Sequence, residues 1–137
     1  MRILLVVDYS PDSDHAVTEF AERRWPPGTI VRVLSVVENV PPSAAELWFD
    51  AGGNLEAVFR ARKEKSEELA AKVAAVLSAK GFTAETVVRH GRPRKVIAAE
   101  AKAWPADMII EGARGMPDIK RGEGGYTDDP IGSEGRQ

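Results

Sequence analysis

The spacing with the clearest chemical meaning lies in residues 108–129, MIIEGARGMPDIKRGEGGYTDD. An aliphatic run ends there at Gly112, Gly115 follows after two intervening residues, and Gly125 follows after nine more. Glycine has no side chain to hold the backbone away from a ligand, so nearby N–H groups can approach an anion closely. The usual phosphate signatures, G-x-x-x-x-G-K-[ST] and G-x-G-x-x-G after a strand, are absent from the sequence. The stretch therefore predicts either an unusual phosphate cradle or a tight turn after a strand.

A second polar group, Asp8-Tyr9-Ser10, follows the first aliphatic run of the chain. A carboxylate in this place could accept a hydrogen bond from a bound ligand. It could also cap the turn and the helix that follow, because Asp side chains accept hydrogen bonds from nearby backbone N–H groups. Both interpretations stay open, since one carboxylate can do both.

The remaining chemically reactive side chains form weaker patterns. His15 and His90 have no serine, carboxylate or metal-ligand spacing around them, and they are interpreted as surface and turn residues. The basic cluster RHGRPRK, residues 89–95, is interpreted as a solvated face, because the third strand should lie at the sheet edge, two spacings of ~4.8 Å from the ligand crevice. Trp48 and Phe49 lie in a long connection and could form a lid or a partner contact. No catalytic constellation is visible in this pattern.

Alternating strands and helices must position these side chains. Aliphatic runs typical of strands covered on both faces occupy Ile3–Val7, Ile30–Val37, Phe82–Val88 and Met108–Ile110. Helical patterns run from Asp12 with Ser10 as N-cap, over Leu55–Lys80, and from Pro93 to about Ala103. This order predicts an α/β fold: a Rossmann-like, doubly wound parallel sheet with helices on both faces and strand order 3-2-1-4. Ligands of such sheets bind beyond the carboxyl ends of the strands, where we expect the first and fourth strands to form a crevice.

Composition and charge limit the classes of protein and of binding partner that fit this sequence. The chain has 137 residues, no cysteine and a formal net charge of −2, which argues against a disulfide scaffold and against nucleic-acid or anionic-membrane partners. No apolar run reaches the ~20 residues of a membrane span, and the opening run is too short for a signal peptide, so we expect a cytoplasmic protein. Residues 1–121 are predicted to form one domain. Residues 122–137 hold a single aliphatic residue, Ile131, and cannot offset ordering costs of roughly 1–2 kcal/mol per residue, so we expect a flexible, glycine-rich acidic tail.

The order and spacing of these pieces resemble the universal stress protein family. Its ATP-binding members carry G-x2-G-x9-G-[ST] after the fourth strand, and Gly112, Gly115 and Gly125 match the glycines that surround the phosphates. ILLVVDYS looks like the opening strand and aspartate of the family, and GRPRKVIAAEAKAWPADMIIEGARG looks like its G-x-P and apolar-G-x-x-G stretch. The resemblance covers about Met1 to Arg121. It implies an adenine nucleotide bound between the first and fourth strands.

The resemblance also assigns the adenosine half of the site. Val6 and Asp8 match positions that face adenine and ribose, and Val36 matches a position whose backbone contacts adenine. The last position of the phosphate motif should be Ser or Thr, but it is Tyr126, whose phenol is far bulkier than a small hydroxyl. Thr127 lies one residue late and would substitute only if the loop shifts.

Two functions fit these residues. The first is a stress-response module that binds ATP weakly, with a regulatory role and at most slow hydrolysis that would depend on bound Mg²⁺. The second is a protein-interaction module of the same fold without nucleotide. Tyr126 and Glu111, a carboxylate placed where it could face phosphate, favour the second function, whereas the intact adenosine half favours the first. A related nucleotide-binding enzyme is a third interpretation, which the missing catalytic constellation disfavours.

The end of the chain departs from the family pattern. Relatives continue into a fourth helix and a fifth strand that commonly pairs two subunits, and neither is visible here. We therefore expect the fifth strand to be missing or replaced. An uncovered edge at Met108–Ile110 would recruit another strand, so we predict self-association as a homodimer, or coverage of that edge by the tail.

Overall fold

The computed structural model of the chain describes residues 1–111 and 119–121. Its strands are β1 (Arg2–Val7), β2 (Ile30–Val37), β3 (Thr83–His90), β4 (Met108–Glu111) and β5 (Ile119–Arg121). Its helices are α1 (Pro11–Glu22), α2 (Leu55–Ala79) and α3 (Pro93–Ala103), with a short π-helical turn, η1 (Ala45–Asp50), between β2 and α2. The predicted series of strands and helices is confirmed. β3 is displaced toward its carboxyl end relative to the prediction, and Glu111 belongs to β4.

The sheet has the predicted parallel order over its first four strands. The full order is β3-β2-β1-β4-β5, and β1 lies between β2 and β4 with parallel pairing on both sides. Val6 is in register with Leu34 of β2 and with Glu111 of β4. The first and fourth strands are therefore adjacent, and their carboxyl ends reach the same rim of the sheet.

β5 corrects the expectation of an open edge at β4. It runs antiparallel to β4 and pairs Ile119 with Ile110 and Arg121 with Met108. A fifth strand is thus present in replaced form, since it is three residues long and precedes residues 122–137. The edge of β4 is covered within the chain, without a second copy and without the tail.

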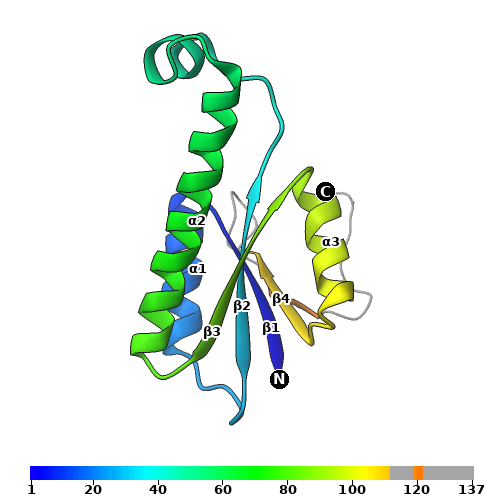
Figure 1. Cartoon of the computed structure of the whole chain (residues 1–137). Helices are drawn as coiled ribbons and strands as arrows, with labels where there is room; N and C mark the ends of the chain where they lie inside the picture. Colours follow the sequence, from blue (N-terminus) through cyan, green and yellow to red (C-terminus); the bar gives the residue numbers. More distant parts are fainter. Residues whose placement is uncertain (112–118, 122–137) are drawn as a thin grey trace.

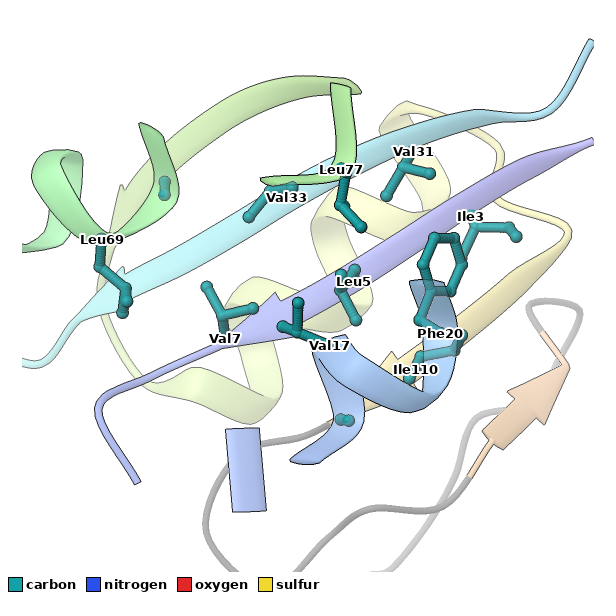
Figure 2. Close-up of a cluster of buried hydrophobic side chains, with 12 residues drawn as sticks. Ile3, Leu5, Val7, Val17, Phe20, Val31, Val33, Leu69, Leu77 and Ile110 are labelled. Carbon is teal, nitrogen blue, oxygen red and sulfur yellow. The ribbon is translucent and has the colours of Figure 1, made fainter. Parts of the chain in front are cut away.

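The helices cover both faces of the sheet, with α1 and α2 on one face and α3 on the other (Figure 1). The first face packs Ile3, Leu5 and Val7 of β1 against Phe20 of α1 and Leu77 of α2 (Figure 2). All five side chains are buried. The alternation of β1 sends its other side chains to the opposite face, which is why an unbroken aliphatic run was needed in the sequence.

The α3 face combines apolar packing with a charged network. Leu4 and Val6 of β1 pack with Ile97 and Ala101 of α3. Glu100 of α3 is only 5% exposed and accepts hydrogen bonds from Arg32 Nη1 at 2.6 Å and from Arg89 Nε at 3.0 Å. Burial alone would raise the pKa of Glu100, but the hydrogen bonds from the two arginines outweigh it and lower the pKa. These contacts join α3 to β2 and β3.

Candidate functional site

β1 ends before β2 does, and this difference opens the carboxyl rim of the sheet. The last pair between these strands is Val7 with Ser35, whereas β2 continues through Val36 and Val37 alongside β3. A cavity of about 700 Å³ lies at this rim on the α3 side. A cavity of this size can hold a drug-sized ligand.

The cavity brings together the adenosine-half residues predicted from the sequence. Val6, Asp8 and Val36 all line it, although Val36 lies 30 residues from Val6 along the chain. The side chains of Val6 and Val36 belong to the apolar cluster on the α3 face, together with Ile97, which lines the same cavity. The cavity therefore has an apolar wall where a flat aromatic base could pack, with a carboxylate beside it.

Asp8 is held in a closed ring of hydrogen bonds at the start of α1. Its Oδ1 accepts from the backbone N–H of Ser10 at 2.8 Å and from the Ser10 hydroxyl at 2.6 Å. The N–H of Asp8 donates to Ser13 Oγ at 3.0 Å, and the N–H of Ser13 donates to Ser10 Oγ at 3.3 Å. Asp8 thus forms the predicted Asx turn before α1, and the N-cap residue of the helix is Ser10. Oδ2 has no hydrogen-bond partner among residues 1–111 and 119–121, so one oxygen is left to accept from a ligand.

Glu111 is a second carboxylate in the cavity. It is 7% exposed, and its place in register with Val6 puts it at the floor of the site. With Glu38, which also lines the cavity, Asp8 and Glu111 give the strand side a negative character. This charge disfavours a polyphosphate that lies directly over the strand ends.

The interpretation of residues 89–95 as a cluster remote from the crevice is wrong. Arg92, Arg94 and Lys95 line the same cavity as Val6 and Asp8. The sequence argument placed the cluster by β3, which does lie at the sheet edge. However, α3 crosses from β3 back over the sheet to reach β4, so the first turn of α3 lies above the carboxyl ends of the inner strands.

A smaller cavity of about 340 Å³ lies on the α2 side of the same rim. Asp8 and Val36 line both cavities. Ser66 of α2 and Ser35 of β2 are both buried in its wall, and Ser66 Oγ donates to Ser35 Oγ at 2.5 Å. This pair satisfies two hydroxyls that would otherwise be buried without partners.

The connection from β2 to α2 is fixed by Arg62. Its guanidinium donates to both carboxylate oxygens of Glu46 at 2.7 and 2.9 Å, and to the carbonyl oxygens of Glu38 and Val40 at 3.0 and 2.8 Å. The hydrogen bonds from Arg62 lower the pKa of Glu46. The segment that carries Trp48 is therefore ordered, although the sequence predicted only an irregular connection there.

The sequence of the chain was compared with models of known protein families. The model of the universal stress protein family matches residues 1–125. The chain belongs to the universal stress protein family. No curated protein sequence matches it significantly.

Solved universal stress proteins share the fold at low sequence identity. UspA from Lactobacillus plantarum is 23% identical with a TM-score of 0.64, over 85% of this chain and 79% of that one. A family member from Burkholderia pseudomallei is 16% identical with a TM-score of 0.64, over 82% and 80% of the two chains. A member from Arabidopsis thaliana, solved with AMP bound, is 17% identical with a TM-score of 0.55, over 84% and 77%. At these identities the comparison shows the fold.

The residues predicted for the phosphate half of the site are not among the described residues. Gly112, Gly115, Gly125 and Thr127 lie outside the described residues, as does the predicted tail 122–137. In the part of this universal stress protein that is described, no group of acidic and histidine side chains has metal-binding geometry. No helix there is long and apolar enough to cross a membrane.

Proposed function

We propose that this universal stress protein binds an adenine nucleotide, ATP, weakly at the cavity on the α3 side of the sheet, and acts as a stress-response regulatory module. The observation that carries the proposal is that Val6, Asp8 and Val36 line one cavity at the carboxyl rim. The AMP-bound relative from Arabidopsis supports an adenine nucleotide as the ligand class. A cytoplasmic location belongs to the same proposal, because ATP is available there.

The residues divide the recognition of adenosine between them. Adenine packs on the apolar wall formed by Val6, Val36 and Ile97, where burial contributes about 25 cal/mol per Å² of apolar surface. A ribose hydroxyl donates to Oδ2 of Asp8. Because the ring of hydrogen bonds through Ser10 fixes the carboxylate before the ligand arrives, little rotamer freedom is lost on binding.

The phosphates extend from Asp8 toward the carboxyl end of β4 in this proposal. Family resemblance gives the backbone around Gly112, Gly115 and Gly125 the role of holding them, with Thr127 as the small hydroxyl. The negative charge of Glu111 nearby opposes them, which is why we propose weak binding and assign regulation ahead of catalysis.

Titration calorimetry with ATP·Mg²⁺ tests the proposal. Binding with Kd below ~100 µM supports it, and no heat at millimolar ligand, which corresponds to only ~4 kcal/mol, contradicts it. Asp8→Asn sharpens the test, because the amide oxygen can still accept from Ser10 while an NH₂ group replaces Oδ2. We expect adenosine affinity to fall about tenfold, in line with the ~1.5 kcal/mol typical of a charged hydrogen bond. Asp14→Asn is the matched control, since Asp14 is exposed on α1 and lines neither cavity.

A protein-interaction module is the second candidate, and the aromatic pair in η1 favours it. Trp48 is 63% exposed and Phe49 is 86% exposed. The Arg62–Glu46 pair holds this turn in place, and large rigid aromatic side chains are typical of interface hot spots. Failure of adenosine, AMP and ATP to bind would select this candidate.

Self-association is also part of the proposal. In the described part of the chain, β5 is the last strand of the sheet on the β4 side, and one side of its backbone is unpaired there. Such edges recruit a second strand. We propose a homodimer formed by pairing of β5 with its own copy.

A further inference from the structure

The wall of the main cavity opposite the strand ends is cationic. Arg92, Arg94 and Lys95, all from the first turn of α3 or the residue before it, line the cavity. The strand side carries three carboxylates, those of Asp8, Glu111 and Glu38, which directly follows β2. The cavity is therefore polarised, negative at the strands and positive at α3.

The position of this wall is fixed by the turn before α3. The N–H of Gly91 donates to the carbonyl oxygen of Val37 at 3.0 Å, which ties the turn to the carboxyl end of β2. Gly91 has a φ of 139°, a conformation that favours glycine, and Pro93 restricts the next turn. The first turn of α3, which carries these cations, therefore begins at a fixed position beside the carboxyl end of β2.

Two of these cations differ from three arginines elsewhere in the described structure. Arg32, Arg62 and Arg89 each pair with a glutamate. Within residues 1–111 and 119–121, neither Arg92 nor Lys95 forms an ion pair. The first turn of α3 contains no acidic residue, whereas the first turn of α1 contains acidic residues. Cations without such a partner, lining a ligand-sized cavity, favour an anion inside it.

We propose that Arg92 and Lys95 bind phosphate groups of the nucleotide from the α3 side of the cavity. This inference rests on the proposed function and specifies its ligand as a nucleotide bound through phosphate as well as through adenosine. The phosphates of ATP then lie between the first turn of α3 and the carboxyl end of β4, where the two cations offset the charge of Glu111. Affinity then rises with the number of phosphates in spite of the three carboxylates that line the cavity.

The experiment compares Arg92→Gln/Lys95→Gln with the control Arg24→Gln/Lys102→Gln. Both doubles remove one arginine and one lysine charge, and Arg24 and Lys102 are exposed and line neither cavity. Adenosine, AMP, ATP and inorganic tripolyphosphate are titrated into each protein by calorimetry, at low and at high salt.

We expect the wild type and the control to bind ATP at least tenfold more tightly than adenosine. The cavity double should bind ATP as weakly as adenosine, with unchanged adenosine affinity. The ATP affinity of the wild type should fall with salt, because charge–charge attraction is screened, and the adenosine affinity should not. Unchanged ATP affinity in the cavity double overturns the inference.

The two proposals fail separately. Adenosine binding without any gain from phosphate, or a gain that persists in the cavity double, leaves the nucleotide function standing and overturns the role of α3. Tripolyphosphate binding that is lost in the cavity double, without adenosine binding, overturns the adenine site and leaves the anion-binding wall standing. If none of the four ligands binds, both proposals are wrong.

Discussion

Asp8 and Glu111 line the same cavity, but their carboxylates should affect ligand binding differently. Asp8 is engaged with Ser10 through Oδ1, so its second oxygen can accept a hydrogen bond from a ligand. Glu111 lies in a strand and is buried at the cavity floor, where its charge is screened less than at the surface. The first residue can recognise a hydroxyl, and the second opposes an anionic ligand.

Removal of the Glu111 charge should strengthen ATP binding. Glu111→Gln keeps the size of the side chain, and loss of a repulsion of at least about 1 kcal/mol, the value in bulk water at close range, corresponds to ATP binding at least about fivefold tighter. Calorimetry measures the affinity, and adenosine serves as the control ligand, because an uncharged ligand should bind the variant and the wild type alike. Equal ATP affinity in the two proteins would show that the phosphates lie beyond the reach of this carboxylate.

At the scale of the elements, α3 connects the site to the rest of the sheet. Its first turn lines the cavity, and its third turn carries Glu100, which binds Arg32 of β2 and Arg89 of β3. Arg32 also lies 4.5 Å from the ring centroid of Trp104, the C-cap residue of α3. The position of the cationic wall therefore depends on a charged network near the far end of the helix.

Glu100 should make the stability of the fold sensitive to acid. Its folded-state pKa is lowered, so the stabilisation is present above the ordinary carboxyl pKa of about 4.3 and is lost as pH falls through the lower folded value. Glu100→Gln should reduce the unfolding free energy at pH 7 by roughly 2 kcal/mol and flatten its decline below about pH 4. Urea unfolding between pH 7 and pH 3 measures both effects. The exposed Glu68 of α2 provides the matched control, Glu68→Gln. An acid limb as steep as that of the wild type would contradict the role of Glu100.

The sequence predicted the elements well because their patterns are local. Continuous aliphatic runs identify buried parallel strands, and Ser10 followed by Pro11 identifies the start of α1, which the structure confirms. The path of α3 across the sheet was implied by the right-handed crossover rule, yet residues 89–95 were placed by their strand alone. Applied to α3, the same rule would have brought Arg92 and Lys95 to the crevice.

Other features depend on contacts that no short pattern encodes. Arg62 meets Glu46 across 16 positions of the chain, and only the folded connection shows that η1 is held. β5 was missed because its three residues include Lys120 and Arg121, which do not form an aliphatic run. Its pairing with β4 comes from the tertiary arrangement, since β-strand preference is strongly context-dependent.

At the scale of the whole molecule, the two cavities and η1 lie at one end of the described fold. Both cavities lie at the carboxyl rim of the sheet, and α2 extends past that rim because its 25 residues span about 37 Å, whereas the eight residues of β2 span about 26 Å. η1, with Trp48 and Phe49, lies beyond the start of α2 at the same end (Figure 1). A ligand in the main cavity and a partner on η1 would therefore lie at the same end of the described fold, the first on the α3 side of the sheet and the second next to α2.

If the chain dimerises through β5, the charge of Lys120 should weaken the dimer. A two-fold antiparallel contact centred on Lys120 places this residue opposite the partner subunit's Lys120, and directly opposed like charges destabilise a strand pair by about 0.2–1 kcal/mol. We therefore expect a weak homodimer that strengthens as salt rises and strengthens in Lys120→Thr, which removes the repulsion and favours a strand. Sedimentation equilibrium over a range of protein and salt concentrations measures the dimer constant, with Lys102→Thr as the matched control. A protein that stays monomeric throughout, or a dimer indifferent to both salt and Lys120→Thr, would exclude the β5 edge as the contact.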